Sequence, residues 1–478
     1  MESKKSTYWC FFYLPLTEYF YNETMRQIKI PYHSDSSYYY ERIRHLDWPV
    51  FIDSCFQPER PKNPLVRYDL LTGQPFKKII EKDGCSVLLS KDDEKTSSLD
   101  PSVLLKKEME NLQINDPSLF FTGGAIGFLA YEKNNVSSKN TLIPKFHFGI
   151  YDWAIIVDHF KSEAFIVSAE MDSNTLAIIN DLLIRLSEKN LPYQSSKFLC
   201  KSSLFSKSLF REYEKNFKQV NKYLIAGDCY QVNLSLKWQV ETEGDSWDFY
   251  KKFRSINQSP FMAYLAYDNF EILSGSPERF ITCEGRNVIT RPIKGTKPRG
   301  SSKDEDIKNK DILINSKKDQ AENLMIVDLL RNDLGINCET GSISVEELFK
   351  LEIYPNVYHL VSTISGKLKK DSTVFDLFFD AFPGGSITGA PKKRAMEVID
   401  ELESHARDFY CGSVAIFSFN NRMDSNIGIR SMVHKDNLMH IYSGGGLTIA
   451  SDAQDEYAEI IQKLGNIQKT IEYFNGQL

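Results

Sequence analysis

A carboxyl group and an amine that could act together lie in residues 274–300, SGSPERFITCEGRNVITRPIKGTKPRG. A strand-like run with a probable hairpin connects Glu278 to Lys294, so both side chains could face one cavity. Lys294 stands in Pro-Ile-Lys-Gly-Thr, where a rigid proline and a permissive glycine let the backbone approach a ligand. Burial and nearby positive charge would favour the neutral amine, which is the nucleophilic form. The nearby basic residues are Arg291, Lys297 and Arg299. The alternative is a pair of ordinary solvated surface charges.

A glycine-rich turn follows in residues 382–403, FPGGSITGAPKKRAMEVIDELE, and leads into a helix start. Free N–H groups and the helix dipole at such a start favour an anion. The turn is not a Walker A loop, because Gly389 is followed by Ala390 and Pro391 where that motif needs Lys. Nucleotide binding is therefore disfavoured, and a carboxylate site or a plain helix start remain as alternatives.

Three glutamates form a candidate Mg²⁺ site. Glu322 lies in one predicted helix, and Glu456 and Glu459 lie three apart on the last helix and so share a face. Mg²⁺ prefers hard oxygen ligands and usually keeps waters, so two or three carboxylates from separate helices would suit it. The alternative is solvent-facing glutamates, with Glu459 and Lys463 forming a simple i,i+4 ion pair.

The elements that would position these groups change along the chain. Residues 1–200 are rich in aromatic and alternating apolar positions, as at 126–132 and 153–160, and predict a β-rich subdomain. A polar stretch at 195–208 breaks the pattern, and we place a subdomain boundary there. The second region, 208–472, carries all the motifs above.

Helix signals recur in this second region. One helix is predicted over 316–334, with Gly335 as its C′ residue; a second spans 391–403, with Pro391 at its first position; a third opens with a Ser451–Gln454 capping box and runs to about 473. Strands are predicted at 411–419 and 437–445. The alternation indicates an α+β fold without regular βαβ units.

The composition is that of an ordinary globular protein. The 478 residues are 42% hydrophobic and carry a formal net charge of -6, which disfavours a nucleic-acid partner. No stretch approaches the roughly 18 apolar residues of a membrane span, and the N-terminus lacks the pattern of a signal peptide. Eight cysteines without a C-x-x-C pair indicate reduced thiols and a cytoplasmic location.

Taken together, these stretches closely resemble the chorismate-binding enzymes, which include anthranilate synthase component I, aminodeoxychorismate synthase component I and the isochorismate and salicylate synthases. The resemblance is strong over about 208–472 and looser before it, through FIDSC, NPLVRYDLL and GGAIGFLAYE. Its main carriers are GDCYQVNLS, SGSPERF, RPIKGTKPRG, AENLMIVDLLRNDLG, VYHLVST, FPGGSITGAPKKRAM, MDSNIGIRS and YSGGGLTIASDAQDEYAEIIQKLG. It implies a large two-sheet antiparallel β-sandwich with helices packed outside, as in anthranilate synthase component I.

Two positions decide where in the family the sequence fits. Gln231 stands where the water-adding members carry a lysine base, so ammonia is the expected nucleophile. Lys294 stands in P-I-K-G-T, which resembles the aminodeoxychorismate synthases, whereas anthranilate synthases read P-I-A-G-T. The resemblance thus implies a transaminase-class enzyme of para-aminobenzoate and folate synthesis. The alternatives are an anthranilate synthase component I, or an inactive member that only binds a glutaminase.

The resemblance also implies roles for individual residues. Mg²⁺ held by Glu322 and Glu459, with Glu456 alongside, would bind the ring carboxylate of chorismate. Glu278 would act as general acid while Lys294 attacks C2, and ammonia would then add at C4 and expel Lys294. The implied substrate-binding residues are Gln231, Gly295, Thr296, His359, Thr388, Tyr410, Arg430, Gly444, Gly445, Gly446 and Lys463. For His359, a hydrogen-bonded core histidine is the alternative.

Two further partners are implied. Ammonia would come from a separate glutamine amidotransferase subunit, because Cys411 lies in YCGSV and not in a G-x-C-x-G elbow. Some relatives bind tryptophan in a pocket that corresponds here to Ser54, Leu65, Val66, Arg67, Tyr68, Pro260, Phe261 and Met262. FIDSC replaces the usual L-L-E-S of that pocket, which argues against feedback inhibition and leaves a structural tryptophan open.

Overall fold

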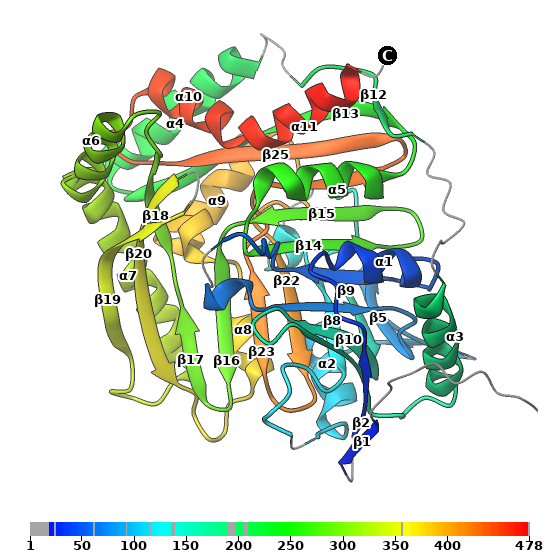
Figure 1. Cartoon of the computed structure of the whole chain (residues 1–478). Coiled ribbons are helices and arrows are strands. Elements are labelled where there is room, and N and C mark those ends of the chain that lie inside the picture. Colours follow the sequence, from blue (N-terminus) through cyan, green and yellow to red (C-terminus); the bar gives the residue numbers. More distant parts are fainter. Residues whose placement is uncertain are drawn as a thin grey trace, which may run out of the picture.

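The structure is a computed structural model that describes residues 19–22, 25–60, 63–91, 93–114, 116–134, 139–188, 197–204, 209–354 and 357–476. Its strands form two large antiparallel sheets (Figure 1). The 13-stranded sheet has the order β1 (Tyr19–Asn22), β2 (Met25–Ile30), β11 (Glu163–Ser168), β10 (Trp153–Asp158), β4 (Tyr68–Thr72), β3 (Val50–Asp53), β14 (Phe261–Ala266), β15 (Glu271–Ser276), β24 (Ser431–Lys435), β25 (Leu438–Leu447), β13 (Gln231–Glu243) and β12 (Leu199–Cys200), with β21 (Gly389–Ala390) paired to β13.

The 12-stranded sheet has the order β18 (Ile293–Pro298), β20 (Val357–Lys367), β17 (Asn287–Thr290), β16 (Arg279–Glu284), β23 (Met423–Asn426), β22 (Ser413–Ser418), β8 (Gly124–Leu129), β9 (Phe146–Tyr151), β5 (Lys77–Lys82), β6 (Cys85–Ser90) and β7 (Asp93–Ser97), with β19 (Ser344–Ile353) paired to β20. The runs predicted as strands at 126–132, 153–160, 411–419 and 437–445 overlap β8, β10, β22 and β25.

Both sheets combine strands from the two halves of the chain. In the first sheet β3 pairs with β14, with Asp53 opposite Met262. In the second, β8 pairs with β22, with Leu129 opposite Ser413. Neither half of the chain, 1–200 or 208–472, therefore forms a sheet of its own. Of the predicted boundary at 195–208, only residues 197–204 lie in the described part of the chain, and the boundary itself stays a prediction.

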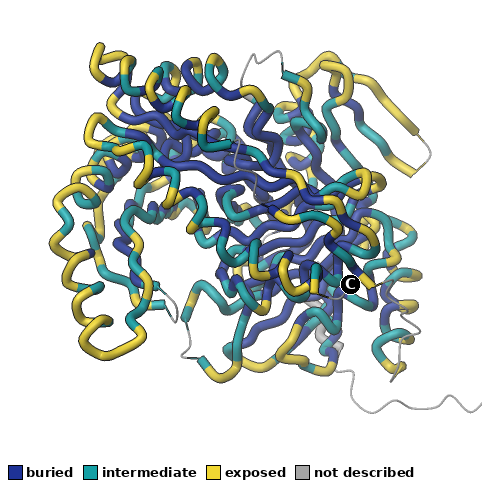
Figure 2. The backbone as a smooth tube through the Cα atoms, turned by 90° about the horizontal axis from the view of Figure 1, so that it is seen from above, coloured by how far each residue is buried: buried dark blue, intermediate teal, exposed yellow. Residues whose placement is uncertain are grey.

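Helices cover the outer sides of the sheets. Against β13, β15 and β25 lie α4 (Leu209–Ala226), α5 (Ser246–Asn257), α9 (Lys392–Leu402) and α10 (Ala453–Lys463), and α11 (Gly465–Asn475) packs on α5. Against the second sheet lie α2 (Pro101–Glu110), α6 (Lys303–Ile314), α7 (Lys317–Asn337) and, on α7, α8 (Val374–Ala381). The short α1 (Ser37–Ile43) packs on α3 (Thr175–Ser187). Figure 2 shows buried strands in the middle and exposed helical turns around them. The α+β fold predicted from the sequence is confirmed.

Helix boundaries differ from the sequence prediction in three places. The helix predicted to stop at Gly335 runs on to Asn337 and is capped at Cys338. Pro391 is the N-cap of α9 and not its first residue. The predicted last helix is two helices divided at Leu464, and its N-cap is Asp452, whose carboxylate accepts from the N–H groups of Gln454 and Asp455.

No helix in the described ranges is long and apolar enough to span a membrane. The seven described cysteines are free thiols, and all but Cys85 are buried. Cys10 and the N-terminal stretch that we tested for a signal peptide lie outside the described residues.

Candidate active site

Glu278 and Lys294, the predicted acid and amine, both form a hydrogen bond with Ser386. Glu278, between β15 and β16, is only 6% exposed, and its Oε1 accepts a hydrogen bond from the Ser386 hydroxyl at 3.2 Å. Lys294, in β18, donates from Nζ to the Ser386 carbonyl at 3.3 Å. The hairpin of β16 and β17 lies between the two positions in the chain. The structure thus brings the two predicted catalytic residues together and does not leave them on the surface.

Burial shifts both groups toward their neutral forms. Burial raises the pKa of the Glu278 carboxyl to about 7, although Lys294 and the Ser386 hydroxyl oppose the shift. Burial also lowers the pKa of the Lys294 amine, with Glu322 and Glu278 opposing and Lys463 assisting. A carboxyl that keeps its proton near neutrality can act as an acid, and a neutral amine can act as a nucleophile.

Two of the three cations expected to assist Lys294, Arg291 and Arg299, are engaged with other residues. Arg291 is bound to Glu352, and Arg299 is bound to Asp306 at 2.7 Å, so both charges are compensated by carboxylates. The cation that lowers the pKa of Lys294 is Lys463, which comes from α10. A contact between residues so far apart in the chain has no local sequence signal.

Arg430 supplies a positive charge without a carboxylate partner. It precedes β24 with φ +51, a left-handed conformation that a non-glycine residue rarely adopts. Within the described ranges its guanidinium makes no hydrogen bond or ion pair, and burial lowers its pKa while the nearby Glu278 opposes this. A half-buried guanidinium in this state fits a carboxylate of a ligand.

His359 and Thr296 lie opposite each other on β20 and β18. The Thr296 hydroxyl and His359 Nδ1 are 2.8 Å apart, and burial lowers the pKa of His359 to about 3. The imidazole is therefore neutral and already hydrogen-bonded, as the core-histidine alternative required. The neighbouring Gly295 has φ +81, and a Cβ there would lie 2.9 Å from Leu313 Cδ1, so only glycine fits beneath α6.

Three further predicted substrate-binding residues, Gln231, Tyr410 and Lys463, lie next to the glycines of β25. A Cβ on Gly446 would lie 2.8 Å from Gln231 Nε2, and one on Gly444 would lie 2.9 Å from the Tyr410 hydroxyl oxygen. Lys463 Nζ donates to the Gly444 carbonyl at 3.0 Å. These three side chains therefore converge on a strand segment that has no side chains of its own.

Gln231 and Thr388, two of the predicted substrate-binding residues, differ in whether their polar atoms are already hydrogen-bonded. Both amide atoms of Gln231 are buried without a hydrogen-bond partner among the described residues, so this side chain is ready to meet a polar ligand. The Thr388 hydroxyl, in contrast, donates to the carbonyls of Gly384 and Gly385 inside its own turn.

The predicted metal ligands surround a lysine. Lys318 Nζ lies 3.3 Å from Glu456 Oε1 and 4.0 Å from Glu322 Oε1. Glu322 Oε1 is buried and has no hydrogen-bond partner within the described ranges, and burial raises the pKa of this carboxyl. Two carboxylates from α7 and α10 thus already share one cation, and an orphaned buried oxygen fits a hard cation.

Glu459 differs from these two. Its side chain is 53% exposed and bound to Lys463 at 2.9 Å, which is the i,i+4 pair that the sequence left open. Among the described residues no group of three or more His, Cys, Asp or Glu is arranged to hold a metal. Because Mg²⁺ often uses one or two carboxylates with substrate and water, Glu322 and Glu456 fit it, and the three-glutamate set stays a prediction.

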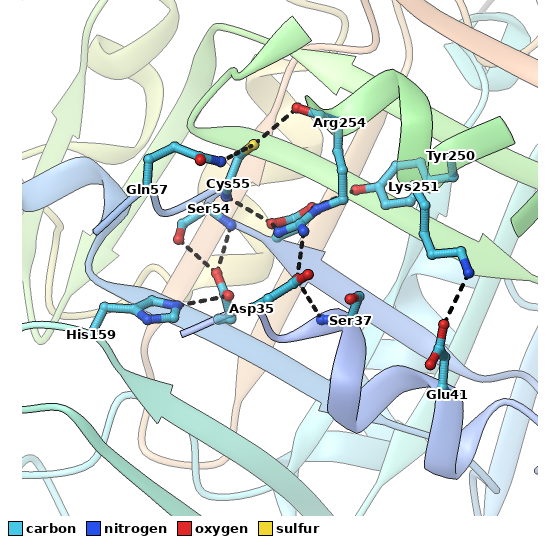
Figure 3. A network of polar contacts seen from close by, with 12 residues as sticks. Asp35, Ser37, Glu41, Ser54, Cys55, Gln57, His159, Tyr250, Lys251 and Arg254 are labelled. Carbon is cyan, nitrogen blue, oxygen red and sulfur yellow. Dashed lines mark hydrogen bonds and ion pairs between the residues drawn. The ribbon is translucent and has the colours of Figure 1, made fainter. Parts of the chain in front are cut away.

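A separate cavity of about 80 Å³ matches the predicted tryptophan pocket. Ser54, Leu65, Tyr68, Pro260, Phe261 and Met262 line it, whereas Val66 and Arg67 do not. Arg67 is bound to Asp158 at 2.7 Å. Ser54 is engaged with Asp69, in a network of polar contacts that extends to His159 and Arg254 (Figure 3). Tryptophan binding at this cavity stays a prediction.

Sequence reasoning missed three residues of the site. Ser386 joins Glu278 to Lys294, Lys318 lies between two of the glutamates, and the Ser451 hydroxyl donates to Glu456 Oε1 at 2.7 Å. Ser386 lies inside the glycine-rich turn already singled out, so its position was a usable signal. Lys318 is one helical turn before Glu322 and would have been found by i,i+4 pairing.

Known proteins resemble this chain over most of its length. A family of proteins described as chorismate binding enzyme matches residues 58–469. Aminodeoxychorismate synthase component 1 of Escherichia coli (strain K12) is 37% identical over 91% of this chain and 96% of its own length. Anthranilate synthase component 1 of Aquifex aeolicus is 33% identical over 74% of this chain and 75% of its own. The crystal structure of anthranilate synthase component I from Streptococcus pneumoniae aligns with a TM-score of 0.72 at 27% identity, covering 86% and 93% of the two chains.

Proposed function

The chain belongs to the chorismate-binding enzyme family, and we propose that it converts chorismate and ammonia to 4-amino-4-deoxychorismate through a covalent bond to Lys294. The observation that carries this proposal is the shared contact of Lys294 and Glu278 with Ser386, at a position where an amine and an acid are both shifted toward neutrality. The similarity to aminodeoxychorismate synthases supports the same choice.

The proposed reaction has two allylic displacements. Lys294 Nζ forms a bond to C2, the ring double bonds shift, and the C4–O bond breaks as Glu278 gives its proton to the leaving hydroxyl, which departs as water. Ammonia then forms a bond to C4 while the C2–Nζ bond breaks and its electron pair returns to Lys294. The proton shed by the new ammonium returns to the Glu278 carboxylate, so both residues are restored.

Binding groups complete the proposal. Arg430 would pair with a substrate carboxylate, and the bare strand at Gly444–Gly446 would accept the ring beside Gln231 and Tyr410. Glu322 and Glu456 would hold Mg²⁺, whose charge would bind and orient the ring carboxylate. Ammonia would come from a separate glutaminase, in keeping with relatives that are called component 1.

Replacing the nucleophile tests this function. We expect Lys294→Ala to lower aminodeoxychorismate formation from chorismate, Mg²⁺ and ammonium at least about a thousandfold, because no other group supplies the amine. Lys297→Ala, on the same strand, should stay near the parent rate. Mass spectrometry of the parent enzyme, quenched with acid after mixing with chorismate, should find a substrate adduct at Lys294, and the Lys294→Ala variant should carry none. An undiminished rate without any adduct would refute the proposal.

The two rival functions give different products. An anthranilate synthase would release pyruvate and fluorescent anthranilate from the same mixture. A family member that serves only as a binding partner would form neither product with ammonium. Chromatography of the parent reaction separates all three cases.

A further inference from the structure

Ser386 is in a position to act on both reacting groups, because its two oxygen atoms serve different partners. Its hydroxyl donates to Glu278 Oε1 at 3.2 Å, and its main-chain carbonyl accepts from Lys294 Nζ at 3.3 Å. The residue is only 5% exposed, so water does not compete strongly for either contact. One residue therefore bridges the acid, which lies between β15 and β16, and the amine, which lies in β18.

The turn that carries Ser386 is held from several sides. A Cβ on Gly385 would lie 2.4 Å from Leu329 Cδ2, so the turn is pressed against α7. The Ile387 carbonyl accepts from Arg407 Nη1 at 3.2 Å, and the Thr388 carbonyl accepts from the Asn233 N–H at 2.8 Å. These contacts fix the backbone on both sides of Ser386, so its oxygen atoms are fixed reference points in the site.

Each contact leaves the reactive part of its partner free. A neutral amine that donates one N–H to the Ser386 carbonyl keeps a lone pair that points elsewhere and can attack carbon. A carboxyl that accepts the Ser386 hydroxyl at Oε1 carries its own proton on Oε2, where a leaving group can take it. The two contacts thus select one orientation for each group.

We propose that Ser386 is a positioning residue that sets the placement of the acid and the nucleophile relative to each other. Its hydroxyl orients Glu278, and its carbonyl orients Lys294. This assignment rests on the proposed function, in which the two groups act on different carbons of one ring and must keep a fixed separation. Orientation of reacting groups is worth large rate factors when it is set in advance.

Removal of the hydroxyl tests the proposal. We expect Ser386→Ala to lower kcat with chorismate and ammonium roughly tenfold or more, with the KM for chorismate within about twofold of the parent, because orientation and not binding is lost. The alkaline limb of the kcat–pH profile should move to higher pH, since the Ser386 hydroxyl is one of the groups that lower the pKa of Glu278. Ser386→Thr keeps a hydroxyl and should recover most of the rate and the parent limb.

Ser276→Ala is the matched control. The Ser276 hydroxyl is also buried and also touches Glu278, but it donates to the main-chain carbonyl at 3.1 Å and not to the carboxylate. This variant should leave the alkaline limb in place even if its melting temperature falls. The melting temperature of each variant shows whether a lower kcat comes from a destabilised fold or from a changed orientation of Glu278 in a folded enzyme.

Three results would overturn the assignment. The first is a Ser386→Ala enzyme whose kcat stays within about twofold of the parent and whose alkaline limb does not shift. The second is a shift of the alkaline limb in Ser276→Ala that equals the shift in Ser386→Ala. The third is a folded Ser386→Thr enzyme that has the same kcat and pH profile as Ser386→Ala. Failure of the proposed function would show differently, as a parent enzyme that forms no aminated product. Failure of the Ser386 assignment alone would leave the parent active.

Discussion

Around Asp53 and Asp69 the buried charges are paired, whereas around Glu278 and Lys294 several buried polar atoms have no hydrogen-bond partner within the described part of the chain. Arg254 binds Asp53 through two nitrogens at 2.7 and 3.0 Å, and His159 binds Asp69 at 2.8 Å (Figure 3). Burial disfavours the Asp69 charge, but His159 and the Ser54 hydroxyl outweigh it and lower the pKa of Asp69 to about 2. Burial raises the pKa of Asp53 although Arg254 opposes the shift, so this network is distinguished by its paired charges and not by undisturbed pKa values.

In the candidate active site, by contrast, several buried polar groups lack hydrogen-bond partners within the described ranges. Among the described residues, Glu322 Oε1 and both amide atoms of Gln231 are buried without a hydrogen-bond partner, and the Arg430 guanidinium forms no ion pair with a carboxylate. Burial raises the pKa of Glu278 to about 7. Because the pKa values of Asp53 and Asp69 are shifted as well, the difference lies in the unsatisfied buried groups, which cost stability and persist where a ligand completes them. The comparison indicates that the Asp53–Asp69 network is structural and the Glu278–Lys294 cluster is functional.

The largest effect is expected for Glu278→Gln. The rate of amination should fall by roughly 10²–10⁴, because the amide cannot give a proton. The pKa of Glu278 is raised from 4.5 to about 7 in the folded protein. Its contribution to stability is therefore complete below the unfolded pKa and is lost as the pH rises through the folded pKa.

The glutamine variant lacks this loss. Its melting temperature relative to the parent should increase between about pH 5 and pH 8, as measured by calorimetry at each pH. Glu241→Gln, at an exposed position, serves as the control and should give a flat difference. A flat difference for Glu278→Gln as well would show that the carboxyl is not held in its protonated form.

The next effect concerns stability and not rate. Asp53→Asn should lower the free energy of unfolding by about 3 kcal/mol, since it leaves the buried Arg254 charge without its main partner. The double variant Asp53→Asn, Arg254→Met removes both charges and should recover part of the loss. Chemical denaturation measures both, and kcat per folded molecule should change less than twofold. A large drop in the kcat of folded Asp53→Asn would show that the Asp53–Asp69 network is not purely structural.

The smallest effect concerns Lys318, which pairs with Glu322 and Glu456. Lys318→Met should tighten Mn²⁺ binding about fivefold, as followed by the electron paramagnetic resonance of free Mn²⁺, because the metal no longer displaces an ammonium. Lys317→Met removes the same charge from an exposed neighbour and should change the affinity less than twofold. Equal shifts in both variants would mean that only net charge matters.

Sequence reasoning was most successful where a function depends on residues close together in the chain. P-I-K-G-T and the glycine-rich turn identified Lys294 and the segment of Ser386, because ligand contacts there use consecutive residues. It failed where a partner comes from far away, as with Lys463 in place of Arg291 and Arg299 beside Lys294. Arg254 and Asp53 lie 201 residues apart in the chain, and no spacing rule predicts such a pair.

Helix ends show the same limit. Gly335 is a plausible stop signal, but α7 continues to Asn337, whose side chain donates to Asp380 at 2.8 Å and so stabilises the extra turn. Ser451 matched a capping box, yet its hydroxyl serves Glu456 and Asp452 caps α10. At Gly335 a tertiary contact overrode local propensity, whereas at Ser451 the next residue took the capping role.

The pairing of β3 with β14 and of β8 with β22 has a consequence for how this polypeptide can be divided. A chain cut between its two halves would leave long unpaired strand edges on each piece, and such edges pair with whatever strand is available. Separately expressed pieces should therefore aggregate on their own and regain activity only as complementing fragments that are produced together.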